Sequence, residues 1–150
     1  MGLEIERKFL LLSNDWRGFV IRALKIKQGY LNSDNSNTVR VRIQDDSAFL
    51  TVKGKSQGIS RLEFEYEIPY NDGLVLLNLC SNSIISKTRF IVPHNLLKWE
   101  IDVFDGDNDG LIVAEIELDS IDQAIDLPNW IGKEVSDDKQ YFNSYISSHP

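Results

Sequence analysis

Hydrophobic and polar residues alternate along several segments of the chain, beginning at its N-terminus. In the first of these segments the charged residues Glu4, Glu6 and Lys8 alternate with mainly apolar neighbours. A period of two residues is typical of a β-strand with one charged face and one apolar face. The same alternation recurs along the chain. It predicts eight strands, at residues 3–11, 25–31, 37–44, 48–55, 60–68, 84–92, 97–104 and 111–119.

Clusters of turn-forming residues separate the predicted strands. The clearest lie at residues 32–37, 45–46, 54–58 and 105–110, which contain mainly Asn, Asp, Ser and Gly. These residue types favour turns. Eight strands at this spacing, mostly joined by short hairpins, predict a mainly β protein of the α+β class, built on an antiparallel barrel or sandwich.

Only a few segments have the pattern of a helix. We expect helices at residues 71–81, in a short segment after Ser120, and from residue 137 to about residue 147. Ser120 and Gln123 have the spacing of a capping box, whereas residues 13–20 are ambiguous and could form one helical turn. The chain of 150 residues contains no repeat or linker, which predicts a single domain over residues 1–150.

The composition, with 42% hydrophobic and 26% charged residues, is that of an ordinary soluble globular protein. The net charge of −7 argues against nucleic-acid binding. The single cysteine, Cys80, excludes an intrachain disulfide and a cysteine-based zinc site. No signal-peptide pattern occurs at the N-terminus, and no apolar run approaches the ~18 residues of a membrane span. We therefore expect a cytoplasmic protein that binds neither nucleic acid nor membrane.

Charged residues within one predicted strand tend to share a sign. The chain contains Glu-x-Glu, Arg-x-Arg, Lys-x-Lys, Lys-x-Arg and Glu-x-Asp pairs. Residues i and i+2 lie only ~7 Å apart on one face of a strand, so like charges repel there. Periodicity alone favours a barrel with an apolar interior and a solvated charged exterior. Same-sign pairs on separate strands are instead what a polyanion site with metal ions requires, because basic pairs hold phosphate oxygens and acidic pairs hold cations.

An interior location of these charges is possible only if acids, bases, water and ligand satisfy each other, because each uncompensated buried ion costs several kcal/mol. The acidic set is Glu4, Glu6, Glu63, Glu65, Glu67, Glu100, Asp102, Glu115 and Glu117, and the basic set is Lys8, Arg40, Arg42, Lys53, Lys55, Arg61, Lys87 and Arg89. The apolar faces would then point outward. Few helices are predicted to cover them, so a homodimer is plausible.

Eight short motifs follow one another in the chain. They are EIERKFL at 4–10, QGYL at 28–31, VRVR at 39–42, TVK at 51–53, KTR at 87–89, WEIDVF at 99–104, EIE at 115–117, and a late group of Glu134, Asp138, Lys139 and Tyr141. In identity and order they resemble the motifs of the CYTH superfamily, the triphosphate tunnel metalloenzymes. The resemblance covers essentially the whole chain and is closest to short bacterial-type inorganic triphosphatases.

The resemblance implies a closed eight-stranded antiparallel β-barrel, a tunnel with a charged interior, and a few peripheral helices that include a C-terminal one. It therefore places the charged faces inside. It also implies two divalent ions, Mg²⁺ or Mn²⁺, bound by carboxylates, which suit hard cations. The implied metal ligands are Glu4, Glu6, Asp102, Glu115 and Glu117.

The same resemblance implies a phosphate-binding set and a catalytic set. The phosphate-binding residues are Lys8, Arg40, Arg42, Lys53, Lys87, Arg89 and Lys139, with Lys139 closing over the site from the C-terminal segment. The catalytic residues are Lys8, Tyr30 and Lys87. Tyr30 would orient substrate or water at the tunnel mouth, and the alternative is an ordinary half-buried strand tyrosine.

The leading hypothesis is metal-dependent hydrolysis of a triphosphate, with inorganic tripolyphosphate giving pyrophosphate and phosphate. Alternatives on the same fold are a thiamine or nucleoside triphosphatase and a class IV-type adenylyl cyclase. Alternatives of another class are a non-catalytic barrel that binds a polyanion and a purely structural barrel. The motifs recognise phosphates and not the leaving group, so the sequence leaves the choice among triphosphates open.

Overall fold

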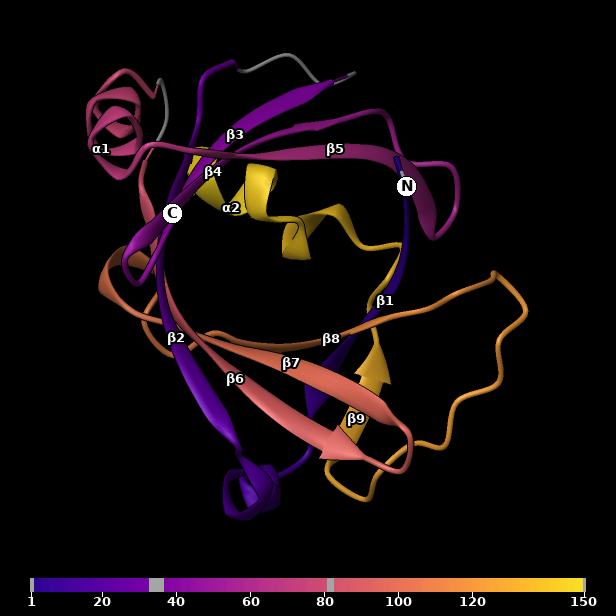
Figure 1. The fold of residues 1–150 in the computed structure, drawn as a ribbon. Coiled ribbons are helices and arrows are strands. Elements are labelled where there is room, and N and C mark those ends of the chain that lie inside the picture. The colour runs from indigo at the N-terminus through magenta and orange to yellow at the C-terminus, as the bar shows by residue number, and fades with distance from the viewer. Residues whose placement is uncertain (1, 33–36, 81–82, 150) are drawn as a thin grey trace.

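Antiparallel strands close into a barrel in the computed structural model, which describes residues 2–32, 37–80 and 83–149 (Figure 1). The barrel strands are β1 (Leu3–Leu11), β2 (Arg22–Tyr30), β3 (Thr38–Gln44), β4 (Ser47–Lys53), β5 (Ser60–Ile68), β6 (Ile85–His94), β7 (Leu97–Phe104) and β8 (Ile112–Glu117). Their order around the barrel is β1-β5-β4-β3-β2-β6-β7-β8, and β8 pairs back with β1. The predicted closed antiparallel barrel is confirmed.

The strand boundaries follow the alternation of the sequence closely. Three predicted strands, 3–11, 60–68 and 97–104, have the bounds of β1, β5 and β7. The main difference is β2, which begins at Arg22, three residues before its prediction. Residues 33–36 of the predicted turn at 32–37 and residue 81 of the predicted helix lie outside the described residues.

A further strand, β9 (Ile131–Glu134), was not predicted. It pairs with Phe9 and Leu11 at the C-terminal end of β1, while Leu3, Glu4 and Ile5 at the other end of β1 pair with β5. β5 and β9 thus share one edge of β1. The four-residue strand is too short to show a clear alternation, and it contains Gly132. A Cβ at Gly132 would lie 3.0 Å from the carbonyl oxygen of Leu10, so the close approach of the two strands favours glycine.

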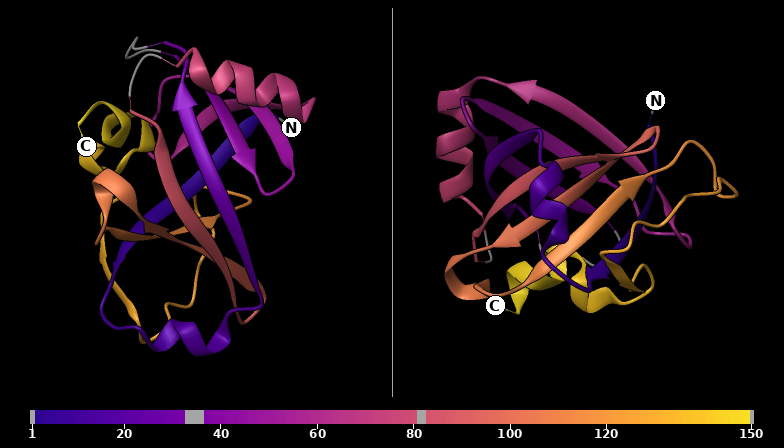
Figure 2. Two further views of the ribbon diagram at one scale, coloured as in Figure 1. Left: turned by 90° about the vertical axis from the view of Figure 1, so that its left-hand side faces the viewer. Right: turned by 90° about the horizontal axis from the view of Figure 1, so that it is seen from below.

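Helices cover only part of the barrel. The predicted helix at 71–81 is confirmed as α1 (Tyr70–Asn78), which packs outside β3 and β4 (Figure 2). A Cβ on Gly73 would lie 2.5 Å from that of Ala48, so α1 can approach β4 this closely only with glycine. The ambiguous segment 13–20 contains one short 3₁₀ helix, η1 (Asp15–Phe19). None of the helices in the described ranges is long and apolar enough to cross a membrane.

The predicted helix after Ser120 is wrong. Residues 119–130 form a loop, and the side-chain oxygen of Gln123 accepts a hydrogen bond from the backbone N–H of Asp119 instead of capping a helix at Ser120. The capping-box spacing alone did not suffice, because no sustained apolar period follows it to give a helix a buried face. Another 3₁₀ helix, η2 (Gly106–Asn108), lies in the β7–β8 turn.

The outward apolar face of β1, β7 and β8 is covered by the chain's own loops, whereas Leu62, Phe64 and Tyr66 of β5 are exposed. Phe9, Trp99 and Ile116 of β1, β7 and β8 form a buried cluster with Trp16 of η1 and Trp130 of the loop before β9. The rings of Trp99 and Trp130 meet edge to face with centroids 5.8 Å apart. The large hydrophobic core thus lies between the barrel and this outer layer, which leaves the interior of the barrel for polar side chains.

The C-terminal segment lies across one end of the barrel (Figures 1 and 2). The predicted helix from residue 137 to about 147 is divided into η3 (Lys139–Tyr141) and α2 (Asn143–Ser148). Ile146 of α2 packs against Ile85, Phe104 and Val113 from the barrel strands, and Tyr30 belongs to the same cluster. This apolar cluster occupies the end of the interior where α2 lies.

Candidate active site

A cavity of about 270 Å³ lies inside the barrel. Most of the charged residues that the sequence offers for the interior line it and point inward, whereas Lys55 and Glu67 are exposed and do not line it. The ionisable lining residues are Glu4, Glu6, Lys8, Tyr30, Arg40, Arg42, Lys53, Arg61, Glu63, Glu65, Arg89, Glu100, Glu115 and Glu117. Lys87 and Asp102 are fully buried beside the residues of this group. A purely structural barrel with an apolar centre is thereby excluded.

The first group of acidic residues comes from β1 and β8, which are neighbours in the barrel. The register pairs Glu6 with Glu117 and Lys8 with Glu115. Glu4, Glu6, Glu115 and Glu117 therefore line the cavity along these two strands, and we call them the acidic seam. Burial, together with the nearby charges of Glu115 and Glu4, raises the pKa of Glu6 to about 8. Burial likewise raises the pKa of Glu117, with Glu4 adding to the effect. The cations of the protein therefore do not fully compensate the negative charges of Glu6 and Glu117.

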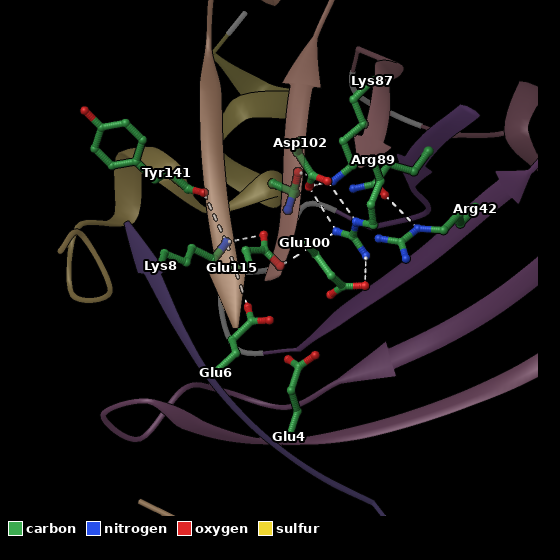
Figure 3. A network of polar contacts seen from close by, with 12 residues as sticks. Glu4, Glu6, Lys8, Arg42, Lys87, Arg89, Glu100, Asp102, Glu115 and Tyr141 are labelled. Carbon is green, nitrogen blue, oxygen red and sulfur yellow. Dashed lines mark hydrogen bonds and ion pairs between the residues drawn. The ribbon is translucent and has the colours of Figure 1, made fainter. Parts of the chain in front are cut away.

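The pKa of Glu115 is shifted in the opposite direction from those of Glu6 and Glu117. Burial opposes its ionisation, but Lys8, Arg89 and Lys87 together outweigh burial and hold the pKa of Glu115 well below its usual range. Its carboxylate oxygens lie 3.5 Å from Nζ of Lys8 and 3.7 Å from the guanidinium of Arg89. Glu115 thus connects the acidic seam to the basic part of the interior (Figure 3).

These carboxylates fit a divalent metal ion. Oxygen donors suit Mg²⁺ and Mn²⁺, and the raised pKa of Glu6 indicates a local excess of negative charge that a cation would relieve. Within the described ranges, no three acidic, His or Cys side chains already form a cage around one point. Such an open arrangement suits Mg²⁺, which usually binds through one or two carboxylates together with water and substrate phosphates.

The basic residues of β3 and β6 gather on the other side of the interior. Arg89 donates to both oxygens of Asp102, at 2.8 and 2.9 Å, and Nζ of Lys87 donates to the same carboxylate at 2.7 Å (Figure 3). Arg40 lies 3.4 Å from Glu65. Arg42 has a different partner, the neutral side chain of Gln28, whose Oε1 accepts from Nε of Arg42 at 2.9 Å.

Asp102 is thus engaged by two cations at once. Burial opposes its ionisation, but Arg89 and Lys87 outweigh burial and lower its pKa. Burial lowers the pKa of Lys87 to about 7, although Asp102 opposes the shift. Both carboxylate oxygens of Asp102 accept hydrogen bonds from Arg89 or Lys87, so Asp102 forms ion pairs with these two residues. Its assignment as a metal ligand stays a prediction.

Two lysines connect the acidic seam to neighbouring segments. Lys53 lies between Glu4 and Glu63, at 3.1 and 3.2 Å. Nζ of Lys8 donates to the backbone oxygen of Tyr141 at 3.2 Å, and it lies 5.3 Å from the centroid of the Phe142 ring. The C-terminal segment therefore contacts a predicted catalytic residue directly.

The structure brings together all the predicted site residues except Lys139. Lys139 is exposed and lines a surface groove formed mainly by residues 133–139, outside the cavity. Its contact with phosphate stays a prediction. Tyr30 is buried and lines the cavity toward the end covered by α2.

The sequence reasoning missed several uncharged residues of the site. Gln28 contacts Arg42, Asn143 accepts a hydrogen bond from Nζ of Lys87 at 3.1 Å, and Ser136 accepts one from the backbone N–H of Lys8. Gln28 stands at an inward position of a recognised motif, so the alternation could have indicated it. Asn143 and Ser136 lie in the C-terminal segment, where the alternation of the strands gives no signal.

Comparisons with known proteins show which family and fold the chain resembles. Residues 2–146 match the model of the CYTH domain family. The chain is 42% identical over 151 residues to an inorganic triphosphatase of Acetivibrio thermocellus, covering all of this chain and 96% of that protein. It is 35% identical over 149 residues to an inorganic triphosphatase of Nitrosomonas europaea, covering 96% of each. The crystal structure of the inorganic triphosphatase NE1496 superposes with a TM-score of 0.69 at 32% identity, covering 96% of this chain and 93% of that one.

Proposed function

The chain belongs to the CYTH domain family, and on this basis we propose that it is a metal-dependent inorganic triphosphatase. The reaction is hydrolysis of tripolyphosphate to pyrophosphate and phosphate. The observation that carries the proposal is the cavity inside the barrel, in which an acidic seam on β1 and β8 faces arginines on β3 and β6. Two relatives that match nearly the whole chain are inorganic triphosphatases, which supports this substrate.

The acidic seam would hold the metal. Glu4, Glu6, Glu115 and Glu117 are the candidate ligands for two Mg²⁺ or Mn²⁺ ions. When bound, such ions neutralise phosphate charge and lower the pKa of a bound water so that it can attack phosphorus. Metal ligation requires the ionised form of Glu6, whose raised pKa makes this carboxylate take up a proton readily when no cation is near.

The basic residues would bind and orient the substrate. Arginine guanidinium groups form paired hydrogen bonds to phosphate oxygens, while lysines act as point charges. Arg40, Arg42 and Arg89 surround the cavity and would hold the phosphates. Lys8 and Lys87 would stabilise the charge that spreads over the transferred phosphoryl group. No covalent nucleophile is needed for this reaction.

The proposal is tested by phosphate release from inorganic triphosphate, thiamine triphosphate and ATP, each with Mg²⁺, with Mn²⁺ or with a chelator. We expect the fastest release from inorganic triphosphate and none with the chelator. Tight triphosphate binding without any phosphate release would instead support a polyanion-binding barrel. Formation of cyclic AMP from ATP and Mn²⁺ would support the cyclase alternative. A homodimer and a cytoplasmic location stay predictions.

A further inference from the structure

Arg42 differs from its neighbouring arginines in its partner. Arg40 lies 3.4 Å from Glu65, and Arg89 is bound to Asp102. Within the part of the chain that the structure describes, no carboxylate lies within ion-pair distance of Arg42, and its Nε donates to Oε1 of Gln28. A neutral amide satisfies the Nε–H group without cancelling the positive charge. The guanidinium is nevertheless buried, so its charge is held in the interior without a carboxylate in direct contact, although the more distant charge of Asp102 stabilises it in part.

Gln28 is held firmly in its position. It is fully buried on β2, and the β2–β3 register places it directly opposite Arg42. Directly opposite residues of an antiparallel pair point to the same face and are close enough to interact. Because Nε–H of arginine can only donate, the amide oxygen must face it and the amide nitrogen must point away. Nε2 of Gln28 has no hydrogen-bond partner in the described residues.

The surroundings of Arg42 favour an incoming anion. Burial, together with the charges of Arg40 and Arg89, lowers the pKa of Arg42 to about 9, so its neighbours repel the guanidinium charge. Figure 3 shows Arg42 and Arg89 pointing toward the same part of the interior. A phosphate bound there would relieve this repulsion. With Nε occupied by Gln28, the two terminal nitrogens of Arg42 stay available for phosphate oxygens.

We propose that Gln28 is a positioning residue for phosphate binding, whose neutral amide orients the Arg42 guanidinium and leaves its charge for a phosphate of the substrate. The inference rests on the proposed function, since it assigns a role within the same cavity. A glutamate at this position would have the same shape, but it would pair with Arg42 and compete with the phosphate. A leucine would fill the space without orienting the guanidinium.

Calorimetric binding of inorganic triphosphate in the presence of a chelator tests the inference, because no turnover occurs without metal. We expect Gln28→Glu to weaken binding about tenfold or more, the size of one charge-assisted hydrogen bond. Gln140→Glu is the matched control, since it adds the same carboxylate at an exposed position outside the cavity. We expect the control to weaken binding by less than about threefold. Equal weakening by both variants would overturn the inference, because an added negative charge at either position would then weaken triphosphate binding, whether or not it contacts Arg42.

A double-mutant cycle separates positioning from a merely structural role. We expect Gln28→Leu to weaken triphosphate binding in the wild-type background and to have no further effect in an Arg42→Lys background, because lysine lacks the Nε–H that Gln28 holds. Equal weakening in both backgrounds, or none in either, would overturn the inference. This cycle also decides the matter if urea unfolding shows that Gln28→Glu does not fold.

The outcomes distinguish this inference from the proposed function. A wild type that binds triphosphate but releases no phosphate contradicts the proposed function alone, and the binding comparison still tests Gln28. A wild type that hydrolyses triphosphate while the Gln28 variants bind it unchanged contradicts only the role of Gln28. A wild type that neither binds nor hydrolyses triphosphate overturns both.

Discussion

Nζ of Lys87 lies 2.7 Å from Oδ2 of Asp102, and both side chains are buried inside the barrel. The same carboxylate accepts two hydrogen bonds from Arg89, which follows Lys87 on the inward face of β6. One carboxylate on β7 therefore fixes two cations of the neighbouring strand. This geometry makes Asp102 a residue that organises the basic side of the cavity.

Asp102→Asn should lower the free energy of unfolding by about 3 kcal/mol, because breaking a buried ion pair leaves its partners uncompensated. Urea unfolding in the presence of a chelator measures this effect. Glu134→Gln is the control, since Glu134 pairs with Arg7 near the surface at 2.6 Å, and exposed pairs contribute less than about 1 kcal/mol. A role as metal ligand alone predicts no loss of stability in the metal-free protein, so an unchanged Asp102→Asn variant would contradict the ion-pair role.

Loss of a carboxylate from the acidic seam should abolish turnover. We expect Glu4→Gln and Glu117→Gln each to reduce phosphate release more than about a hundredfold, since a bound metal supplies several kcal/mol of transition-state stabilisation. Glu67→Gln is the matched control, because Glu67 is exposed on β5 and does not line the cavity. Phosphate release measured over a range of Mg²⁺ and Mn²⁺ concentrations checks the effect. If Glu67→Gln were equally damaging, the metal assignment would be wrong.

Most of the barrel could be predicted from the sequence because its strands alternate clearly. The bounds of β1, β5 and β7 follow directly from that alternation. Same-sign pairs such as Arg40 and Arg42 raised an interior location as an alternative, since like charges at this spacing are unfavourable without a ligand between them. Alternation alone favoured a charged exterior, and only the resemblance of the motifs to a known family placed these charges inside. The short strand β9 could not be predicted, because its four residues depend on pairing with the end of β1.

The supporting residues of the site were harder to predict than its charges. Gln28 and Asn143 are uncharged, and their importance lies in contacts to Arg42 and Lys87 that only the folded chain creates. The ion pairs of the cavity likewise depend on how neighbouring strands are aligned with one another. Asp102 lies opposite Arg89 because β6 and β7 pair in one particular alignment, which a pattern of alternation does not specify.

The raised pKa of Glu6 predicts a pH dependence of stability. Its folded-state pKa is about 8, against an ordinary value of 4.5, because of burial and the charges of Glu115 and Glu4. The folded protein therefore binds more protons than the unfolded chain between these values, so this stabilisation is fully present below about pH 4.5 and is lost as pH rises toward 8. We expect the metal-free protein to lose stability from pH 5 to pH 7, a range below the titration of Lys87, as measured by urea unfolding.

Glu6→Gln isolates the contribution of this carboxyl group. The variant has no proton to lose at this position, so we expect a visibly flatter stability profile between pH 5 and pH 7. Saturating Mg²⁺ should reduce the slope in the wild type, because the ionised carboxylate then gains a counterion. An identical slope in the wild type and in Glu6→Gln would show that other groups cause the pH dependence.

The apolar cluster at the α2 end should couple stability to catalysis. Ile146 is buried against Ile85, Phe104 and Val113, so Ile146→Ala should cost about 3 kcal/mol of unfolding free energy. The same helix carries Asn143, which accepts a hydrogen bond from Nζ of Lys87. Loosening α2 should therefore also lower kcat for inorganic triphosphate, measured at a temperature where the variant is fully folded.

Ile121→Ala is the matched control for this prediction. Ile121 is 62% exposed in the loop between β8 and β9, so its truncation should change the unfolding free energy by less than about 0.5 kcal/mol and leave kcat unchanged. Asn143→Ala should lower kcat with a much smaller effect on stability than Ile146→Ala, because it removes the contact to Lys87 while the apolar cluster stays packed. If Asn143→Ala kept the wild-type kcat, the hydrogen bond from Nζ of Lys87 to Asn143 would have no part in turnover. The effect of α2 on catalysis through this contact would then be contradicted.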